Sequence, residues 1–290
     1  MKSIIMRKKT FGLFILFLLL SIDAICQTSA SWFKTSEVSP GVFRIDDNGA
    51  VNVYLIIGKD SALVVDTGMG SADLVSKLKK LTSKPLIVVN THGHPDHTGA
   101  NFQFKKVYIH PDEIQAAINT NTPEQRRSAA QNMLQGQKPA KEESYTGPIE
   151  DTKYVAVREG FVFNLGGRTI RVIETPGHTP GELVLLDVEN KLLFTGDNDN
   201  TLVWLFLPAC KPLHEYLVSL EKLQKKISEF TTLLPGHGIL CPSDFINDQV
   251  KCVKGILDKS LEAKPYKSFA GDAMMSTWGR ASVAFDPKNL

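Results

Sequence analysis

The chain is poor in cysteine, which excludes a fold held together by a disulfide framework. Four cysteines occur in 290 residues, and Cys26 lies in an N-terminal segment that we expect to be removed. The remaining three, Cys210, Cys241 and Cys252, are an odd number and do not make a paired framework. In an oxidising compartment Cys241 and Cys252 could pair, but both could equally be buried thiols, which we favour. The hydrophobic core must therefore hold the fold.

An apolar run long enough to span a membrane is also missing. The N-terminal apolar stretch, residues 11–22, is too short to cross a bilayer comfortably. Basic residues precede it, Asp23 ends it, and Ala24 and Cys26 are small residues before a plausible cleavage point. A lipid anchor on Cys26 is an alternative that Asp23 and Ile25 fit less well. We predict a signal peptide over residues 1–26 and an exported protein, periplasmic or secreted, with no other membrane attachment.

Neither sign of charge is in excess. The chain has 33 basic and 31 acidic residues. The predicted signal peptide takes four basic and one acidic residue, which leaves 29 against 30 and a net charge of −1. A nearly neutral protein has no long-range attraction for nucleic acid or anionic lipid. We therefore expect a small-molecule substrate and no nucleic-acid partner; nothing in the composition indicates an oligomeric state.

Short apolar segments separated by turn residues fill the first half of the mature chain. Residues 42–45, 51–57 and 62–65 have the pattern of paired strands. Ser71 is a good N-cap for a helix whose leucines recur at helical spacing, Leu74, Leu78 and Leu81. Residues 85–89 are continuously apolar, as in a strand buried on both faces. The strand, helix, strand order predicts an α/β fold with a functional loop after the last strand.

The second half continues this mixture of strands and helices. Further strands are predicted over residues 107–109, 161–175, 183–187, 192–194 and 233–234, with a turn at Gly166 and Gly167 making the second of them a hairpin. Helices are predicted over 111–118, 212–230 and from a Ser243 cap to about residue 261, and residues 281–285 could form an edge strand.

A polar stretch interrupts this pattern at residues 119–154. It is rich in Gln, Lys and Glu, contains a helical patch at residues 124–135 and is longer than an ordinary connection. It is either a solvated excursion or a lid, since long loops are often functional. No linker or repeat divides the mature chain, so we expect residues 27–290 to form one domain.

Metal-ligand residue types are concentrated in one short run. His92, His94, Asp96 and His97 lie within six residues, directly after the predicted strand 85–89. Further candidates stand alone on turns that follow predicted strands, and these are His178, Asp197 and His237. Imidazole nitrogen and carboxylate oxygen are donors that suit zinc and its divalent neighbours. A cluster of this density indicates a metal site more strongly than a set of ordinary core histidines.

The spacing suggests how two ions could be shared. His92 and His94 alternate on an extended turn and can bind one ion, while Asp96 and His97 can serve a second. Each ion then needs a further imidazole from a distant loop, and one carboxylate can bridge ions about 3.5–4 Å apart. By contrast, His110 and His214 lack strand-end context and are read as ordinary histidines.

Other residues could support such a site. Asp66 follows a neighbouring strand and could accept the spare N–H of a ligand histidine or simply cap its turn. Cys210 could be a soft ligand, but Asp197 already fills that role. The apolar stretch 202–207 contains Trp204 and Phe206; these could line a greasy substrate pocket, or the stretch could pack in the core.

Together these motifs resemble those of the metallo-β-lactamase superfamily. The resemblance covers roughly residues 40–240 and rests on Asp66-Thr67-Gly68, the run 92–97, and the turns that carry His178, Asp197 and His237. It implies a four-layer αββα sandwich of two mixed β-sheets flanked by helices. It also implies that His92, His94 and His178 hold the first metal, that Asp96, His97 and His237 hold the second, and that Asp197 bridges them.

The resemblance implies a dinuclear zinc hydrolase that cleaves an ester, thioester, lactone or amide-like bond through a hydroxide bridging the metals. Asp96 would orient that nucleophile and relay its proton, and iron or manganese could replace zinc. A β-lactamase is one alternative, although its best-known subclass has cysteine at the position of Asp197. Acyl-homoserine-lactone lactonases commonly have a tyrosine shortly after the aspartate, where this chain has residues 198–200. That difference counts against a lactonase. A persulfide dioxygenase with a single iron is the alternative from another reaction class.

Overall fold

The computed structural model describes residues 32–120, 122–133 and 152–290. The predicted signal peptide lies outside these ranges, as do residues 134–151 of the predicted polar excursion. Trp32–Leu290 form one unit by their contacts. Within the described ranges, no helix is both long enough and apolar enough to cross a bilayer.

The first sheet has seven strands in the order of the sequence. They are β1 (Phe33–Ser39), β2 (Val42–Asp47), β3 (Asn52–Ile57), β4 (Ala62–Val65), β5 (Leu86–Val89), β6 (Lys106–Ile109) and β7 (Lys153–Ala156). Neighbours run antiparallel from β1 to β4 and parallel from β4 to β7. Because β4 and β5 are parallel, Asp66 and the run that begins at Thr91 leave the sheet at the same edge.

The second sheet has six strands in the order β14-β13-β11-β10-β9-β8. They are β8 (Val162–Asn164), β9 (Thr169–Glu174), β10 (Leu183–Asp187), β11 (Leu192–Gly196), β13 (Thr232–Pro235) and β14 (Cys241–Pro242). Strands β9, β11 and β13 share one direction, since β10 is antiparallel to β9 and β11, and β13 is parallel to β11. The turns that carry His178, Asp197 and His237 therefore emerge at one edge.

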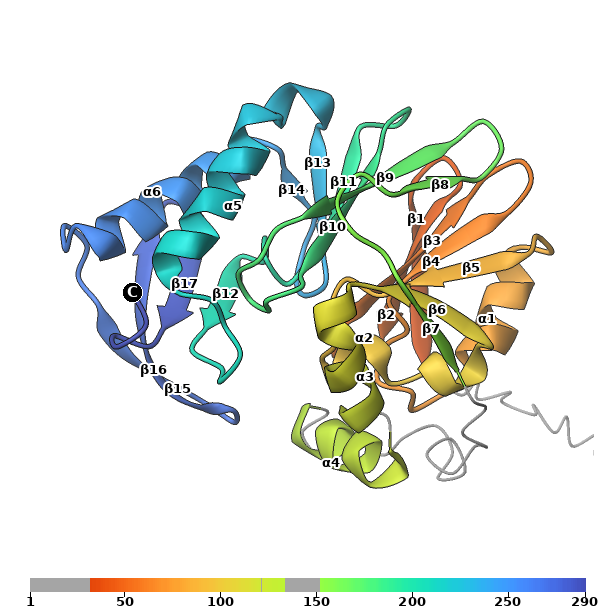
Figure 1. Cartoon of the computed structure of the whole chain (residues 1–290), viewed down its shortest axis with the longest axis horizontal. Helices are drawn as coiled ribbons and strands as arrows, with labels where there is room; N and C mark the ends of the chain where they lie inside the picture. The colour runs from red at the N-terminus through yellow and green to blue at the C-terminus, as the bar shows by residue number, and fades with distance from the viewer. Residues whose placement is uncertain (1–31, 121, 134–151) are drawn as a thin grey trace, which may run out of the picture. The chain divides into compact units, whose positions relative to one another are not determined.

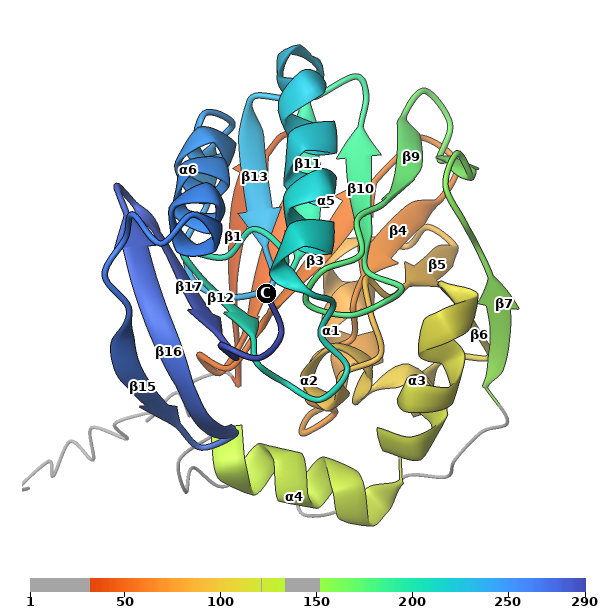
Figure 2. The same ribbon diagram turned by 60° about the vertical axis from the view of Figure 1, so that its left-hand side comes forward.

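The two sheets pack face to face around a shared apolar core. Buried side chains of both sheets meet there, and the rings of Tyr54 and Phe194 touch edge to face with centroids 5.2 Å apart. Helix α1 (Leu74–Leu81) covers the outer face of the first sheet, and α5 (Leu213–Lys225) and α6 (Phe245–Leu257) cover that of the second. Figure 1 and Figure 2 show these layers. The predicted four-layer αββα arrangement of two mixed sheets is confirmed.

A third, smaller sheet was not predicted. Its order is β12-β17-β16-β15, formed by β12 (Leu202–Leu205), β15 (Lys264–Ser268), β16 (Gly271–Trp278) and β17 (Ala281–Phe285). It lies beside α5 and α6 (Figure 1) and shares their core through Val203, Leu205 and Val283. The strand predicted at residues 281–285 is confirmed as β17, but its predicted place at an edge is wrong, because β17 pairs with β12 on one side and β16 on the other.

Several helix boundaries also differ from the predictions. Asp73, not Ser71, caps α1, and its carboxylate accepts the Ser76 N–H at 2.9 Å. Asp244, not Ser243, is the N-cap of α6, which ends at Leu257. The predicted helix 212–230 is α5 followed by a 3₁₀ turn at Ile227–Glu229. The other helices are α2 (Pro95–Thr98), α3 (Ile114–Thr120) and α4 (Pro123–Met133), with 3₁₀ turns at Asn101–Gln103 and Pro111–Glu113.

The three cysteines in the described part of the chain are unpaired, as favoured from the sequence for Cys241 and Cys252. Cys210, Cys241 and Cys252 are buried free thiols. The sulfur of Cys252 lies 3.5 Å from the Ser276 carbonyl oxygen, and that of Cys241 lies 3.6 Å from the carbonyl oxygen of Ile239. The alternative of a Cys241–Cys252 disulfide does not hold.

Candidate metal centre

All seven predicted ligand residues meet at the shared edge of the two large sheets. Three groups of side chains place their donor atoms within 4.8 Å of one another. These groups are His92, His94 and His178; His92, His97 and Asp197; and Asp96, His97 and His237. The loops after β5, β9, β11 and β13 supply them, so residues up to 145 positions apart converge.

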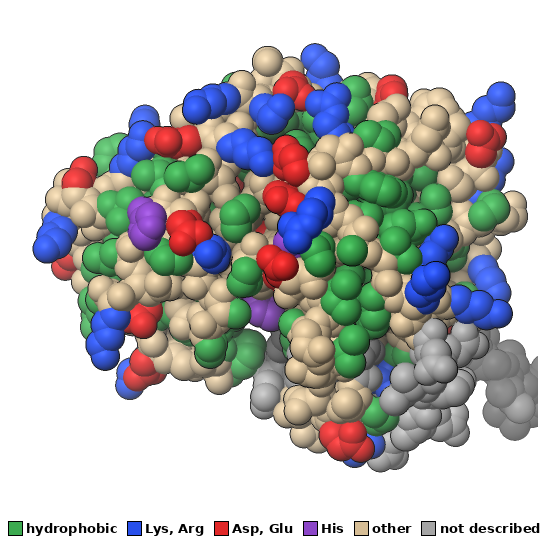
Figure 3. Space-filling view, viewed as in Figure 1, with side chains coloured by type: hydrophobic (Ala, Val, Ile, Leu, Met, Phe, Trp, Pro, Cys, Tyr) green, Lys and Arg blue, Asp and Glu red, His purple; other side chains and the backbone are tan. Residues whose placement is uncertain are grey.

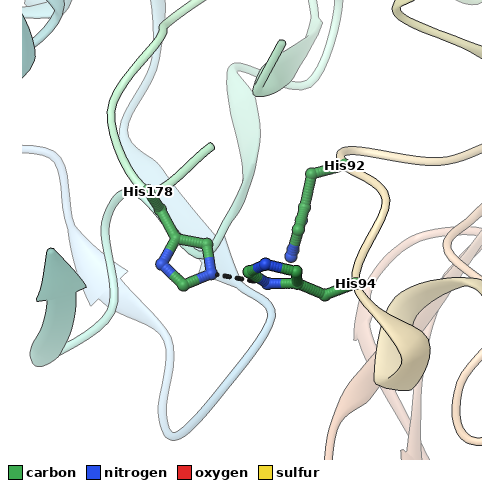
Figure 4. A group of neighbouring side chains, drawn as sticks. All are labelled: His92, His94 and His178. Atoms are coloured by element: carbon green, nitrogen blue, oxygen red, sulfur yellow. Dashed lines mark hydrogen bonds between the residues drawn. The ribbon is translucent and has the colours of Figure 1, made fainter. Parts of the chain in front are cut away.

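The first trio consists of three imidazoles. His94 Nδ1 and His178 Nε2 approach to 2.9 Å, as Figure 4 shows, and His92 points its ring toward them. The ring planes are nearly perpendicular, with centroids 4.7 Å apart for His92 and His94 and for His94 and His178. Three imidazole nitrogens within 4.8 Å of one another fit a binding site for a divalent cation.

The second trio, Asp96, His97 and His237, combines two imidazoles with a carboxylate. Asp96 Oδ2 lies 3.1 Å from His237 Nε2 and 3.5 Å from His97 Nε2. Helix α2 begins at Pro95, so Asp96 and His97 project from its first turn while His94 is its N-cap. The bend at the start of this short helix therefore separates the two pairs of the 92–97 run, as the sequence suggested.

Asp197 lies between the two trios. Its Oδ2 is 3.5 Å from His178 Nε2 and 3.3 Å from His237 Nε2, and its Oδ1 is 3.4 Å from His97 Nε2. A single carboxylate thus reaches the imidazoles of both groups. This is the placement that a bridging ligand requires.

Some buried polar atoms of the candidate ligands have no hydrogen-bond partner in the described part of the chain. His92 Nε2, His97 Nε2 and Asp197 Oδ1 are buried and have no hydrogen-bond partner among the described residues. An unpaired buried polar atom costs free energy, and folded proteins rarely keep one without a reason. Divalent cations would accept these lone pairs, so the residues present fit a metal centre.

In three candidate ligands, the ring nitrogen Nδ1 contacts a partner outside the donor groups, while Nε2 faces the centre. His178 Nδ1 contacts the Trp204 carbonyl oxygen at 2.7 Å, and His237 Nδ1 contacts that of Ala50 at 2.7 Å. His97 Nδ1 lies 2.8 Å from Asp66 Oδ2. Such contacts fix the tautomer and orientation of a ligand histidine and leave Nε2 free for the metal.

Asp66 is tied to the ligand loop by three hydrogen bonds. Besides His97, its carboxylate accepts the Thr91 N–H at 2.7 Å and the Thr91 hydroxyl at 2.9 Å. Its backbone φ of 63° is in the left-handed region that few non-glycine residues adopt. The Asp66 side chain therefore contacts a candidate ligand histidine and also holds the neighbouring turn. Both roles considered from the sequence are observed.

Two buried glutamates were missed by the sequence analysis. Glu182 Oε1 accepts the backbone N–H of Asp197 at 3.0 Å and lies 3.4 Å from His92 Nδ1. Glu113 accepts the N–H of Gly93 at 2.9 Å and that of Gly181 at 2.7 Å. Glu182 stands directly before the apolar run 183–186, an unusual place for a charge that could have drawn attention. Glu113 carries no comparable signal.

Further hydrogen bonds hold the outer loops. The Asn198 side chain accepts the His178 N–H at 2.9 Å, and that of Asn200 accepts the His237 N–H at 3.1 Å. Gly196, with φ of 50°, leaves no room for a Cβ, which would collide with Glu182 and Thr91. The turn Thr195-Gly196-Asp197 therefore needs glycine to bring the backbone this close.

The electrostatics of the two trios differ. Burial lowers the pKa of His92 to about 3 and holds that of His94 well below its usual value. Burial also opposes protonation of His237, but the carboxylates of Asp197 and Asp96 outweigh it and raise its pKa to about 10. The pKa of His97 is raised by the same carboxylates and by Asp66. The carboxylates around His97 and His237 thus attract positive charge, whereas His92 and His94 of the first trio are held as neutral imidazoles.

A cavity of about 460 Å³ opens onto the centre. Candidate ligands His94, Asp96, His178, Asp197 and His237 form one side of it. Trp204 lines the cavity as the sequence suggested; Phe206 is absent from the lining and packs behind Trp204, with ring centroids 5.2 Å apart. Figure 3 shows histidine at the base of a hollow with hydrophobic side chains beside it.

The remaining candidates lie outside these groups. His110 contacts Glu174 at 3.1 Å, and His214 contacts the carbonyl oxygen of Leu290 at 2.9 Å. Cys210 directs its sulfur to the His178 carbonyl oxygen at 3.1 Å rather than toward the donor cluster. None of the three belongs to a donor group among the described residues.

Comparison with known proteins identifies the family. The pattern of the metallo-β-lactamase superfamily matches residues 46–246. Human acyl-coenzyme A thioesterase MBLAC2 is 26% identical over 247 residues, covering 72% of this chain and 82% of the relative. The atrochrysone carboxyl ACP thioesterase AacuM of Aspergillus aculeatus is 29% identical over 217 residues, covering 71% and 58%.

Solved structures share the fold. A metallo-beta-lactamase from Pontibacter korlensis superimposes with a TM-score of 0.55 at 18% identity, covering 77% of this chain and 99% of that one. The family pattern spans more than half of the sequence and includes every candidate ligand. The chain therefore belongs to the metallo-β-lactamase superfamily, as one of its hydrolases.

Proposed function

We propose that this chain is a dinuclear zinc-dependent thioesterase, which hydrolyses an acyl thioester to a carboxylate and a thiol. The observation that carries the proposal is the position of Asp197, within 3.5 Å of imidazoles from both trios. Curated relatives named as acyl-CoA and acyl-carrier thioesterases support the choice of bond. An ester or lactone has the same carbonyl chemistry but no such support.

Zinc suits the available donors. Five imidazoles and two carboxylates surround the centre, and no thiol contributes among the described residues. Nitrogen and oxygen donors in this ratio suit zinc, and iron or manganese accept the same set. Divalent ions held by these residues would supply a water of lowered pKa, toward about 7, and a Lewis acid for a carbonyl oxygen.

Asp96 is the residue we assign to proton transfer. It lines the cavity, its Oδ2 lies 3.1 Å from His237 Nε2, and it is the carboxylate on the first turn of α2. In the hydrolysis, water adds to the carbonyl carbon and the carbon–sulfur bond breaks. Asp96 takes the proton released by the water and returns it to the departing sulfur, so a thiol and a carboxylic acid leave the site.

The supporting residues keep this arrangement fixed. Asp66 and the Trp204 and Ala50 carbonyls set the rings of His97, His178 and His237. Glu182 holds the backbone of Asp197. Preorganised donors of this kind spare the enzyme from reordering its groups during the reaction.

Thiol release from acyl thioesters tests the proposal. Zinc-loaded protein should hydrolyse them, chelation should abolish the activity, and Asp96→Asn should lower kcat by about 10²–10⁴-fold. His214→Ala, a change at an exposed histidine outside the centre, serves as the matched control and should keep full activity. If thioesters are untouched while a β-lactam is opened, or oxygen is consumed with a persulfide, the assignment is wrong.

Export of the protein is a separate proposal, based on the sequence of residues 1–26. The basic start, the short apolar stretch and the small residues before Gln27 are its support. Mass spectrometry of the native protein should find Gln27 as the first residue, in the periplasmic or secreted fraction. An uncleaved chain in the cytosol would contradict export and leave the enzymatic proposal intact.

A further inference from the structure

Aromatic side chains of the third sheet form one wall of the cavity. Trp204 comes from β12, and Phe269 stands at the tip of the β15–β16 hairpin, between Ser268 and Gly271. Their ring centroids are 5.5 Å apart. Phe206 and Tyr266 support Trp204 from behind, with centroids 5.2 and 6.3 Å from its ring.

This wall is joined directly to the metal centre. The carbonyl oxygen of Trp204 contacts His178 Nδ1 at 2.7 Å, so the strand that carries the aromatic ring also positions a candidate ligand. Leu202 and Leu207 line the same cavity. A substrate whose carbonyl carbon sits at the ligands must therefore lay its remaining atoms along apolar surface.

Exposure of Phe269 points to a ligand. Its side chain is 62% exposed, although it lies beside the site on a tight hairpin. Large apolar side chains that border a cavity and remain open to water often mark where a ligand binds. Apart from the candidate ligands, the described residues of the cavity lining include no Lys, Arg or His, so no cationic side chain there would pair with a charge at the far end of an acyl chain.

Phe269 also lies beyond the region that matches the superfamily pattern, which ends at residue 246. The metal ligands belong to the shared frame, whereas the hairpin belongs to the C-terminal part of this chain. Selectivity can therefore be set on the third sheet without changing the catalytic groups.

We propose that Trp204 and Phe269 form an acyl-binding wall that selects thioesters with an apolar acyl chain and disfavours chains that end in a charge. The hydrolytic part rests on the proposed thioesterase function. Each buried methylene should raise kcat/KM about fourfold until the wall is covered. A carboxylate at the far end would lose its hydration without gaining a partner.

Phe269→Ala separates this role from a structural one. The ratio of kcat/KM for an octanoyl thioester to that for an acetyl thioester should fall about tenfold, since roughly 50 Å² of apolar contact is lost. Phe269→Leu should restore most of the ratio. Trp278→Ala is the matched control, because Trp278 is an aromatic residue of the same sheet outside the cavity lining. An unchanged ratio in Phe269→Ala would overturn the proposal.

Calorimetry keeps the test independent of hydrolysis. The zinc-loaded protein should bind decanoate, and the Phe269→Ala variant should bind it about tenfold more weakly. Sebacate has the same length but a second carboxylate, and the unmodified protein should bind it at least tenfold more weakly than decanoate. If no thioester is hydrolysed yet these differences appear, the proposed function fails and the acyl wall stands. Equal affinities of the two protein forms, or of the two acids, would refute the wall.

Discussion

Glu113 is a single buried side chain that fastens two ligand loops to each other. One carboxylate oxygen accepts the Gly93 N–H from the 92–97 run, and the other accepts the Gly181 N–H from the loop that carries His178. Both bonds are lost if the carboxylate is removed. The two loops that supply the first trio then have no common anchor at this point.

Glu113→Ala should therefore weaken zinc binding by about 10–100-fold, the usual cost of losing a residue that supports a ligand. Glu113→Gln keeps one acceptor and should give a smaller loss. Glu221→Ala removes a partly exposed glutamate on α5 and is the control. Competition with a chromophoric chelator measures the affinity, and values within twofold of the unmodified protein would show that Glu113 does not support the site.

Asp47 is a buried carboxyl that should make the stability of the protein depend on pH. Burial raises the pKa of Asp47 from 3.8 to about 6, against the hydrogen bonds from the Met69 N–H and Trp32. A carboxyl whose pKa is raised by folding stabilises the fold below about pH 4, and that contribution is lost as the pH rises through about 6.

The consequence can be isolated with Asp47→Asn. In metal-free protein, the free energy of unfolding of the wild type relative to this variant should fall by about 3 kcal/mol between pH 4 and pH 7, because one pKa unit corresponds to about 1.4 kcal/mol. Urea titrations across this pH range measure the difference in unfolding free energy between the two proteins. The change of that difference with pH is free of any pH-independent effect of the substitution. A difference that stays constant would mean that Asp47 titrates normally.

The sequence predicts the role of a residue well when its partners are close to it in the chain, and poorly when they are distant. His92, His94, Asp96 and His97 could be recognised because ligands on one turn are adjacent in the chain. Glu113 could not, because its partners are 20 and 68 positions away and an isolated glutamate is usually exposed. Trp204 and Phe206 are two positions apart and would share a face of one strand, but β12 ends at Leu205, so Phe206 does not follow Trp204 into the cavity lining.

At the scale of elements, α1 shows how a helix start is decided by geometry. Ser71 and Asp73 are both good N-caps, but only Asp73 is positioned to accept the Ser76 N–H. Ser71 is fully buried instead. The sequence therefore located the helix correctly but not its first residue, since either cap was compatible with the spacing of the leucines.

Removing this cap tests its contribution. Asp73→Ala should lower the free energy of unfolding by about 1 kcal/mol, because the first turn of α1 would lose a side-chain acceptor. Asp73→Asn keeps an oxygen in place and should lose less. Urea denaturation of both variants provides the comparison. Equal stability of Asp73→Ala and the wild type would show that solvent satisfies that N–H equally well.

The third sheet was missed for a different reason. Strand β15 is largely exposed and β16 is exposed at both ends, so neither has the regular apolar alternation that predicts a strand. Only β17 carries that pattern, which is why residues 281–285 resembled an isolated edge. The pairing with β12, some 80 positions earlier, depends on tertiary packing against α6 and leaves no local trace.

At the scale of the molecule, the candidate metal centre draws its residues from both halves of the sandwich. The first sheet supplies the run 92–97, and the second supplies His178, Asp197 and His237. Buried donor atoms of His92, His97 and Asp197 at this edge have no hydrogen-bond partner among the described residues. Ions that bind only the folded protein stabilise it according to their concentration and affinity.

Chelation should therefore lower the melting temperature. At a free zinc concentration about 1,000 times the dissociation constant, binding contributes about 4 kcal/mol, which corresponds to roughly 10 °C for a domain of this size. Calorimetric scans with and without a chelator measure the shift, and added zinc should reverse it. A melting temperature indifferent to both treatments would argue against a metal that bridges the sheets.

Counting the metal in each chain decides most directly whether seven side chains hold two ions. For the purified protein, elemental mass spectrometry together with protein quantification should give two zinc ions per chain. The count should drop to about one in His237→Ala and stay at two in His214→Ala. One iron per chain in the unmodified protein, or a zinc count that His237→Ala leaves unchanged, would contradict the two-ion centre.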